Sequence, residues 1–172
     1  GAFGEYFANW SYYDRYIADL NHSIAGNTTY VFSYGNDGPG FGTHEGEEGV
    51  TALKVGSSTQ YGSTNWDSIA SADQIVYGDV SAFASNGPDF DGNLAPDVLA
   101  NGGRGAGSSA LNTNGLYGGV TPFNGWTAWE TWGGTSRSAP VAGGNLALVY
   151  EAYKARYGTW PTYQQAKDLL MA

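Results

Sequence analysis

One short segment in the last third of the chain places the strongest constraint on what this sequence can fold into. It reads Gly134-Thr135-Ser136-Arg137-Ser138-Ala139-Pro140 and is followed by the small residues Val141-Ala142-Gly143-Gly144. This glycine-flanked turn presents a hydroxyl where a helix is expected to begin, and the amides at a helix start favour negative charge. Ser136 is therefore a candidate nucleophile. The alternative is that the Gly-Thr-Ser turn only caps the helix, as Ser and Thr commonly do.

The composition excludes several classes of protein. The 172 residues are enough for one domain with a hydrophobic core. The net charge is −9 with only 7 Lys and Arg, which argues against a nucleic-acid partner and against an anionic membrane surface. No apolar run approaches the roughly 18–20 residues that would span a bilayer. The absence of cysteine excludes disulfides, thiol catalysis and cysteine-ligated zinc.

Periodicity and turn signals predict short strands alternating with helices. The predicted strands cover residues 29–34, 51–56, 80–84 and 97–100, and the predicted helices cover residues 12–25, residues 136–153 and a last segment that starts at the capping pair Thr162 and Gln165. Helices that flank short apolar strands indicate an α/β protein with a largely parallel sheet. Residues 103–133 lack periodicity, and long loops of this kind are often functional.

A second motif lies about 100 residues before the first, where a β-branched and aromatic run ends in Tyr34-Gly35-Asn36-Asp37-Gly38. Taken alone, Asn36 is a turn residue that tolerates left-handed backbone. Taken together, the two motifs resemble those of the subtilisin-like serine proteases, or subtilases, which carry a G-T-S-x-S/A-x-P nucleophile motif and a G-N-x-G turn. The resemblance implies that Ser136 is the nucleophile and that the Asn36 amide donates to the oxyanion.

Three further blocks resemble the same family. Residues 52–58 are similar to A-L-T-V-G-A-S, residues 81–88 to S-F-S-S-R-G-P, and residues 91–98 to D-G-R-L-K-P-D-V. The five blocks follow the family's order over about residues 28–150, which implies the subtilisin-like α/β fold, a mostly parallel sheet flanked by helices. The sedolisins also use a G-T-S serine, but they place aspartate in the oxyanion hole, so Asn36 favours the subtilisin branch.

The chain departs from the family in its catalytic base. In subtilases the catalytic aspartate and histidine precede the oxyanion asparagine by a long stretch, whereas 35 residues precede Asn36 here. His22 lies in a predicted helix without the family's context, and His44 follows Asn36 rather than preceding it. We therefore expect residues 1–172 to form the C-terminal part of a subtilase peptidase domain. The base and its aspartate would lie on a preceding segment or on a separate chain.

The resemblance also implies a substrate pocket beside Asn36. Its wall would be formed by Phe32, Ser33, Tyr34 and Gly35, although Phe32 is equally expected to pack in the core. A tryptophan-rich stretch before Ser136 would either form a rim for apolar side chains or bury itself as a satellite core. The tryptophans concerned are Trp126, Trp129 and Trp132.

No cofactor is implied as required, but calcium is a common structural ion in this family and prefers clustered carboxylates. The close carboxylates are Asp89 with Asp91, and Glu45 with Glu47 and Glu48; solvated charge is the alternative. Three glycosylation sequons favour an extracellular or cell-surface location, and any export leader would precede Gly1.

The predicted function is a serine endopeptidase that cuts peptide or protein substrates through an acyl-enzyme on Ser136. A fragment or chain that carries the missing aspartate and histidine would be its partner. The alternative is a catalytically inactive module, derived from a subtilase and kept for structure or assembly.

Overall fold

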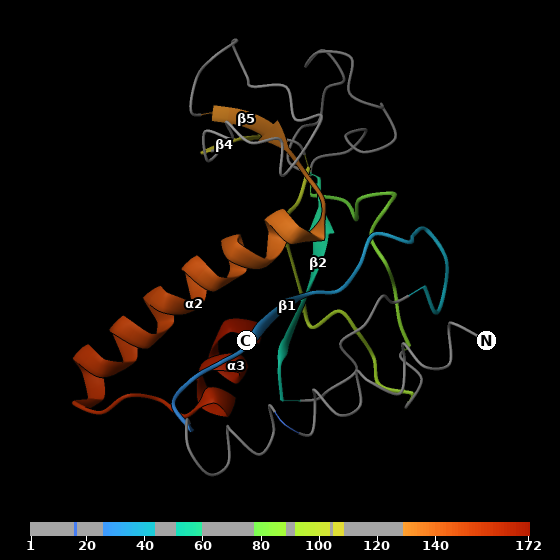
Figure 1. Ribbon diagram of the computed structural model, residues 1–172. Helices are drawn as coiled ribbons and strands as arrows, with labels where there is room; N and C mark the ends of the chain where they lie inside the picture. Colours follow the sequence, from blue (N-terminus) through green and yellow to red (C-terminus); the bar gives the residue numbers. More distant parts are fainter. Residues whose placement is uncertain are drawn as a thin grey trace.

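A computed structural model describes residues 16, 26–43, 51–59, 78–88, 92–103, 105–108 and 129–172. Its centre is a parallel sheet of three strands in the order β1-β2-β3 (Figure 1). The strands are β1 (Val31–Ser33), β2 (Leu53–Ser58) and β3 (Val98–Asn101). This confirms three of the predicted strands and the predicted α/β class with parallel strands.

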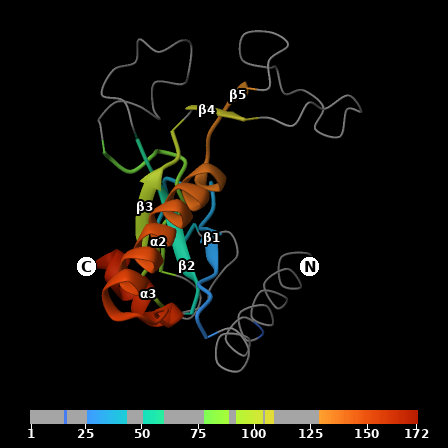
Figure 2. The same ribbon diagram turned by 90° about the vertical axis from the view of Figure 1, so that its left-hand side faces the viewer.

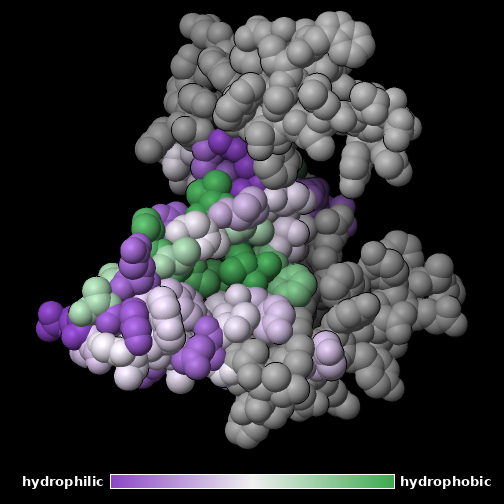
Figure 3. All heavy atoms as spheres, turned by 60° about the vertical axis from the view of Figure 1, so that its left-hand side comes forward, coloured by the Kyte–Doolittle hydropathy of each residue, from purple (hydrophilic) through white to green (hydrophobic). Residues whose placement is uncertain are grey.

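Two helices cover one face of this sheet, with α2 crossing the near face of the strands in Figure 2. They are α2 (Thr135–Tyr157) and α3 (Tyr163–Met171). The core lies between sheet and helices because alternate residues of β2 point to the helical face. It consists of the buried residues Leu53, Val55, Ala142, Leu146 and Ala166. Figure 3 shows apolar residues gathered in the same region, where α2 lies beside β1.

The long helix α2 begins and ends at glycines with positive φ. Gly134, with φ 106°, precedes it, and Gly158, with φ 74°, follows it in the left-handed conformation that a helix C-terminus commonly needs. The Gly158 amide donates to the carbonyl of Lys154 at 2.9 Å. The predicted helix over 136–153 is confirmed, and it continues one turn further to this glycine.

The last helix, α3, is capped as its sequence predicts and is attached to the sheet through a buried charge. Thr162 accepts from the amide of Gln165, whose side chain accepts from the Thr162 amide in return. The buried charge is that of Lys167 in α3. Its Nζ lies 2.9 Å from Asp97 Oδ2 and 2.8 Å from the carbonyl oxygen of Ala52.

The predicted strand over 80–84 is wrong. Val80 makes an isolated bridge to Ser58, after which the chain turns and the Ala84 amide donates to the carbonyl of Ser81. The amides that follow bond to other loops, since Ser85 donates to the carbonyl of Gly35 at 3.1 Å. Hydrogen bonds to distant segments thus replace a ladder.

The region expected to lack regular structure contains a two-stranded antiparallel ladder. Its strands are β4 (Gly105–Ser108) and β5 (Trp129–Trp132), paired from Gly105 with Trp132 to Ser108 with Trp129. The ladder lies beyond the carboxyl ends of β2 and β3 (Figure 1). Of the predicted helix over 12–25, only Tyr16 belongs to the described residues, and it is helical. Among the described helices, none has the length and apolar character needed to cross a bilayer.

Candidate active site

Three segments meet at the carboxyl edge of the parallel sheet. Asn36 follows β1, Gly102 follows β3, and Ser136 is the second residue of α2, directly after the turn at Gly134. The turn is held against the sheet because the Gly134 amide donates to the carbonyl oxygen of Gly102 at 2.8 Å. The carboxyl ends of parallel strands are the usual position of ligand sites in open α/β sheets. Ser136 itself is exposed at this edge.

The structure brings Asn36 to the residue next to Ser136. Asn36 Oδ1 accepts a hydrogen bond from the Thr135 amide at 2.8 Å and another from Thr135 Oγ1 at 3.1 Å. Thr135 is fully buried, and its hydroxyl accepts from the Gly35 amide at 3.3 Å. Because an amide N–H must face an oxygen, these contacts fix which way the Asn36 carboxamide points. Its NH2 group is the donating end of the same side chain.

The backbone amide of Ser136 differs from the neighbouring amides at the start of α2 in its hydrogen bonding. The Thr135 amide is bonded to Asn36, and the amides of Arg137 and Ser138 donate to the carbonyl oxygen of Gly134 at 2.9 and 3.3 Å. In the part of the chain that the structure describes, the Ser136 amide alone among these has no acceptor. The start of a helix leaves such donors for a ligand or water, and here one lies directly beside an exposed hydroxyl.

Beneath this turn lies a buried set of small residues that sequence reasoning did not assign to the site. Ser57 Oγ and Ser81 Oγ are 2.7 Å apart, and Ser138 Oγ is buried with no hydrogen-bond partner. A Cβ at Gly102 would lie 2.2 Å from Ser57 Oγ, 2.3 Å from Ser138 Oγ and 2.7 Å from the Gly134 carbonyl oxygen. Only glycine fits at position 102. The small residues within the recognised blocks were the sequence signal for this close approach.

Arg137 also belongs to the site, although the sequence did not single it out. Its side chain is half-buried, and Nη1 donates to Asn101 Oδ1 at 3.2 Å and to the carbonyl oxygen of Gly103. Arg137 thus contacts the end of β3 while Thr135 contacts the end of β1. Its place directly after Ser136 was visible in the sequence, but its partners are more than 30 residues away.

The residues predicted to bind substrate lie along β1 and its end. Phe32 and Ser33 are half-buried, whereas Tyr34 and Gly35 are buried. The Tyr34 amide donates to the carbonyl of Val55 at 3.0 Å, so this backbone segment is bonded into the sheet. Tyr34 is only 1% exposed and offers almost no surface to a ligand.

Several sequence predictions fall outside the described residues. They concern the histidines His22 and His44, the carboxylates Glu45, Glu47, Glu48, Asp89 and Asp91, and the tryptophan Trp126. Trp129 and Trp132 begin and end β5. Within the described ranges, no group of three or more histidine, cysteine or acidic residues could hold a metal ion.

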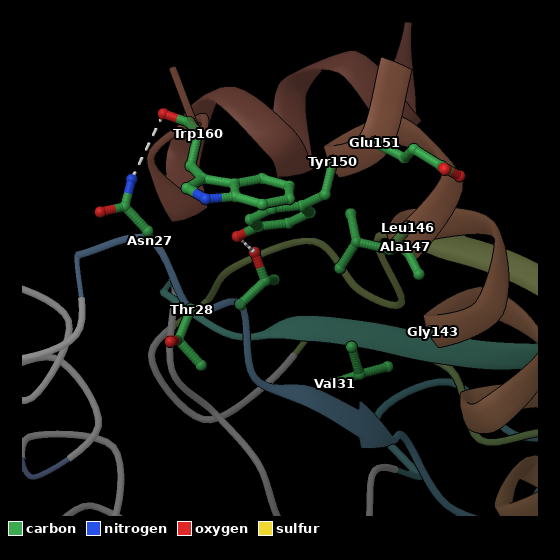
Figure 4. A pocket seen from close by; sticks show the side chains of 10 residues that line it. Asn27, Thr28, Val31, Gly143, Leu146, Ala147, Tyr150, Glu151 and Trp160 are labelled. Carbon is green, nitrogen blue, oxygen red and sulfur yellow. Dashed lines mark hydrogen bonds between the residues drawn. The ribbon is translucent and has the colours of Figure 1, made fainter. Parts of the chain in front are cut away.

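A cavity of about 720 Å³ lies away from Ser136, where the chain enters β1 beside α2 (Figure 4). Trp160 and Tyr150 form its aromatic side, and Tyr150 hydrogen-bonds Thr29 at 2.8 Å. Asn27, the first residue of one sequon, lines the cavity and donates its side-chain amide to the carbonyl oxygen of Pro161 at 2.7 Å. The cavity begins about two helical turns along α2 from the serine, at Gly143, and does not belong to the site around it.

Comparison with known proteins places this arrangement in a family. A search of curated proteins found no match to the chain. The model of the subtilase family matches residues 2–172. The match covers the three parallel strands, both helices and the turn that carries Ser136. The chain therefore belongs to the subtilase family of serine peptidases.

Proposed function

We propose that this chain carries the nucleophile and the oxyanion-binding groups of a serine endopeptidase. Ser136 is the nucleophile, and the oxyanion is bound by the Ser136 amide together with the Asn36 side chain. One observation supports this above all: the Thr135 amide donates to Asn36 Oδ1 at 2.8 Å, which joins two segments 99 residues apart beside one exposed hydroxyl. A cap alone would require neither the exposed serine nor the unbonded amide next to it.

The reaction follows from these positions. Ser136 Oγ attacks the carbonyl carbon of a peptide bond, and the negative charge that develops on the carbonyl oxygen is stabilised by the two donors and the amino end of α2. The amine leaves, an acyl-enzyme on Ser136 remains, and water releases it. Fixed donors lower the barrier because they are already oriented before the charge appears. The reaction needs no cofactor, and any bound calcium would serve the structure only.

In this proposal the general base of the reaction comes from outside these 172 residues. We propose that a histidine, oriented by an aspartate, reaches Ser136 from a preceding segment or a separate chain. It takes the proton of the Ser136 hydroxyl during the attack and gives it to the leaving amine, and it then removes a proton from the water that releases the acyl group. Residues 1–172 would then be the C-terminal part of the peptidase domain. Peptides and proteins are the substrates, and the place of action is extracellular or at the cell surface.

An activity-based probe tests the proposal. Native material that contains the segment with the histidine and aspartate is treated with a fluorophosphonate, digested and mapped by mass spectrometry. We expect the label on Ser136 and the loss of peptide hydrolysis in proportion to labelling. Ser136→Ala should remove the label and lower kcat by about 10⁶-fold, the value known for subtilisin.

Ser138→Ala provides the matched control, because it removes another hydroxyl from the same helical turn that has no hydrogen-bond partner. It should label and hydrolyse as the unaltered protein does. If Ser136 stays unlabelled while the complete partner segment is present, the proposal is wrong. That result would favour the alternative of an inactive structural or assembly module.

A further inference from the structure

Arg137 places a guanidinium on the side of the nucleophile that faces β3. Its Nη1 donates to Asn101 Oδ1 at 3.2 Å and to the Gly103 carbonyl oxygen. Asn36 lies on the opposite side, after β1, and the strand order is β1-β2-β3. The nucleophile of the proposed reaction therefore lies between an oxyanion donor on one side and a fixed positive charge on the other.

The guanidinium keeps binding capacity after these contacts. Arginine has five N–H donors, and the two on Nη1 are directed at Asn101 and Gly103, which leaves the three on Nη2 and Nε. Within the described residues no carboxylate forms an ion pair with Arg137, although its side chain is half-buried. Both groups that accept hydrogen bonds from Arg137, the side-chain amide of Asn101 and the carbonyl of Gly103, are uncharged and do not neutralise the guanidinium.

The other basic residues that the structure describes are placed elsewhere. Lys54 and Lys167 are buried, and Lys167 is paired with Asp97. Lys154 and Arg156 lie in the last turn of α2, about 25 Å along the helix from Arg137. The protein has a net charge of −9. Among the basic residues that the structure describes, Arg137 is thus the one that lies beside Ser136.

We propose that Arg137 makes this peptidase prefer substrates with an acidic side chain one or two residues from the scissile bond, on the side of β3. The inference rests on the function proposed above and adds a class of substrate to it. A planar guanidinium binds a carboxylate through two parallel hydrogen bonds. An extended peptide advances about 3.3 Å per residue, so a side chain at that distance reaches the group that follows Ser136. The local charge also offsets the repulsion that the acidic protein exerts on an acidic substrate.

A purely structural role for Arg137 predicts something different. If the side chain only ties the loop after β3 to α2, its loss changes the hydrolysis of every substrate by the same factor. The ratio between an acidic substrate and its neutral isostere then stays constant. This ratio is therefore the quantity to measure.

The experiment uses native enzyme with its base-bearing segment and pairs of peptides that differ only by Asp or Asn. The pairs scan the first two positions on each side of the scissile bond. We expect kcat/KM for Asp to exceed that for Asn by roughly three- to tenfold at one of these positions, as for a partly exposed ion pair. The ratio should fall as salt is raised, because screening weakens the attraction.

Two variants remove the charge in different ways. Arg137→Met deletes the guanidinium, and Asn101→Asp neutralises it in place while keeping an oxygen for Nη1. Both should bring the Asp-to-Asn ratio close to one. Arg156→Met makes the same change in net charge at the far end of α2 and should leave the ratio as it is. If Arg137→Met fails to fold, Asn101→Asp still decides the question.

The outcomes separate this inference from the function on which it rests. Active enzyme with a flat Asp-to-Asn ratio at all four positions overturns the inference alone, as does a ratio that survives both variants. Absence of both hydrolysis and Ser136 labelling in complete enzyme overturns the proposed function and this inference with it.

Discussion

At the scale of single residues, one carboxamide serves both the fold and the proposed chemistry. The residue before α2 is Gly134, which has no side chain to cap the helix. Asn36 Oδ1 takes that place from a distant strand end by accepting from the Thr135 amide. The capping that would explain this asparagine structurally is thus the same contact that orients it beside Ser136.

Substitutions of Asn36 distinguish the structural role of its side-chain oxygen from the proposed catalytic role of its NH2 group. Asn36→Leu removes acceptor and donor, so we expect kcat to fall by ~10²–10³-fold, the cost known for subtilisin, and stability to fall by about 1 kcal/mol through loss of the cap. Asn36→Asp keeps the oxygen for Thr135 and should retain the stability while losing the activity. Steady-state kinetics and urea denaturation measure the two effects. Full activity in Asn36→Asp would contradict the assignment of the donor.

Gly102 offers a second prediction at this scale. A Cβ there would overlap two hydroxyls and the Gly134 carbonyl oxygen, so Gly102→Ala must displace the turn that carries the nucleophile. We expect a loss of about 1–3 kcal/mol in unfolding free energy and a fall in kcat of ~10²-fold, as a misplacement of about 1 Å produces.

The matched control for Gly102 is Gly144 in the exposed part of α2, where an added Cβ meets nothing within 4 Å. Gly144→Ala should raise stability by about 0.5–1 kcal/mol through helix propensity. Thermal denaturation compares the two. A Gly102→Ala variant as stable and active as the parent would show that the turn yields without cost.

At the scale of elements, α3 is held to the sheet by a buried ion pair. Asp97 Oδ2 receives the Lys167 ammonium at 2.9 Å and the Lys54 amide at 2.7 Å, while Lys167 also donates to the carbonyl of Ala52. Both side chains are nearly buried, at 7% and 11% exposure. Burial makes such a pair sensitive to the loss of one partner, because the other charge is left without compensation.

Lys167→Met should therefore destabilise the protein by about 3–5 kcal/mol. The double variant Lys167→Met with Asp97→Leu should recover part of this loss, because no unpaired charge remains, although the Lys54 amide still loses its acceptor. Lys154→Met, at a half-buried lysine of α2 whose Nζ donates to the Gly158 carbonyl at 2.6 Å, removes one exposed hydrogen bond and should cost about 1 kcal/mol or less. Denaturant titration measures all three, and a Lys167→Met variant no less stable than Lys154→Met would refute the argument.

At the scale of the whole molecule, β2 is the centre of the described structure. It pairs with β1 on one side and β3 on the other, and its first five residues are buried. Both helices pack over the same face. The site around Ser136 lies at the carboxyl edge of this rigid centre, so its geometry depends on the sheet more than on the loops.

Hydrogen exchange tests this view of the molecule. Backbone amides of β2 should be the most protected, because they open only when the sheet unfolds, whereas the last turn of α2, which is largely exposed, should exchange by local fraying. Mass spectrometry of peptides covering residues 53–58 and 150–157 measures the difference. Equal rates for the two segments would mean that the sheet is not the stable core.

Some features of this protein could be predicted from its sequence alone. Local periodicity and caps predicted three strands, α2 and the capping box of α3, since these signals depend on neighbours within one or two turns of chain. The family motifs also selected Ser136 and Asn36. Only the tertiary structure decided the rest: the turn at residues 81–84, the ladder of β4 and β5, and the contacts of Arg137. Each depends on hydrogen bonds between segments tens of residues apart, and such partners leave no periodic trace in either segment.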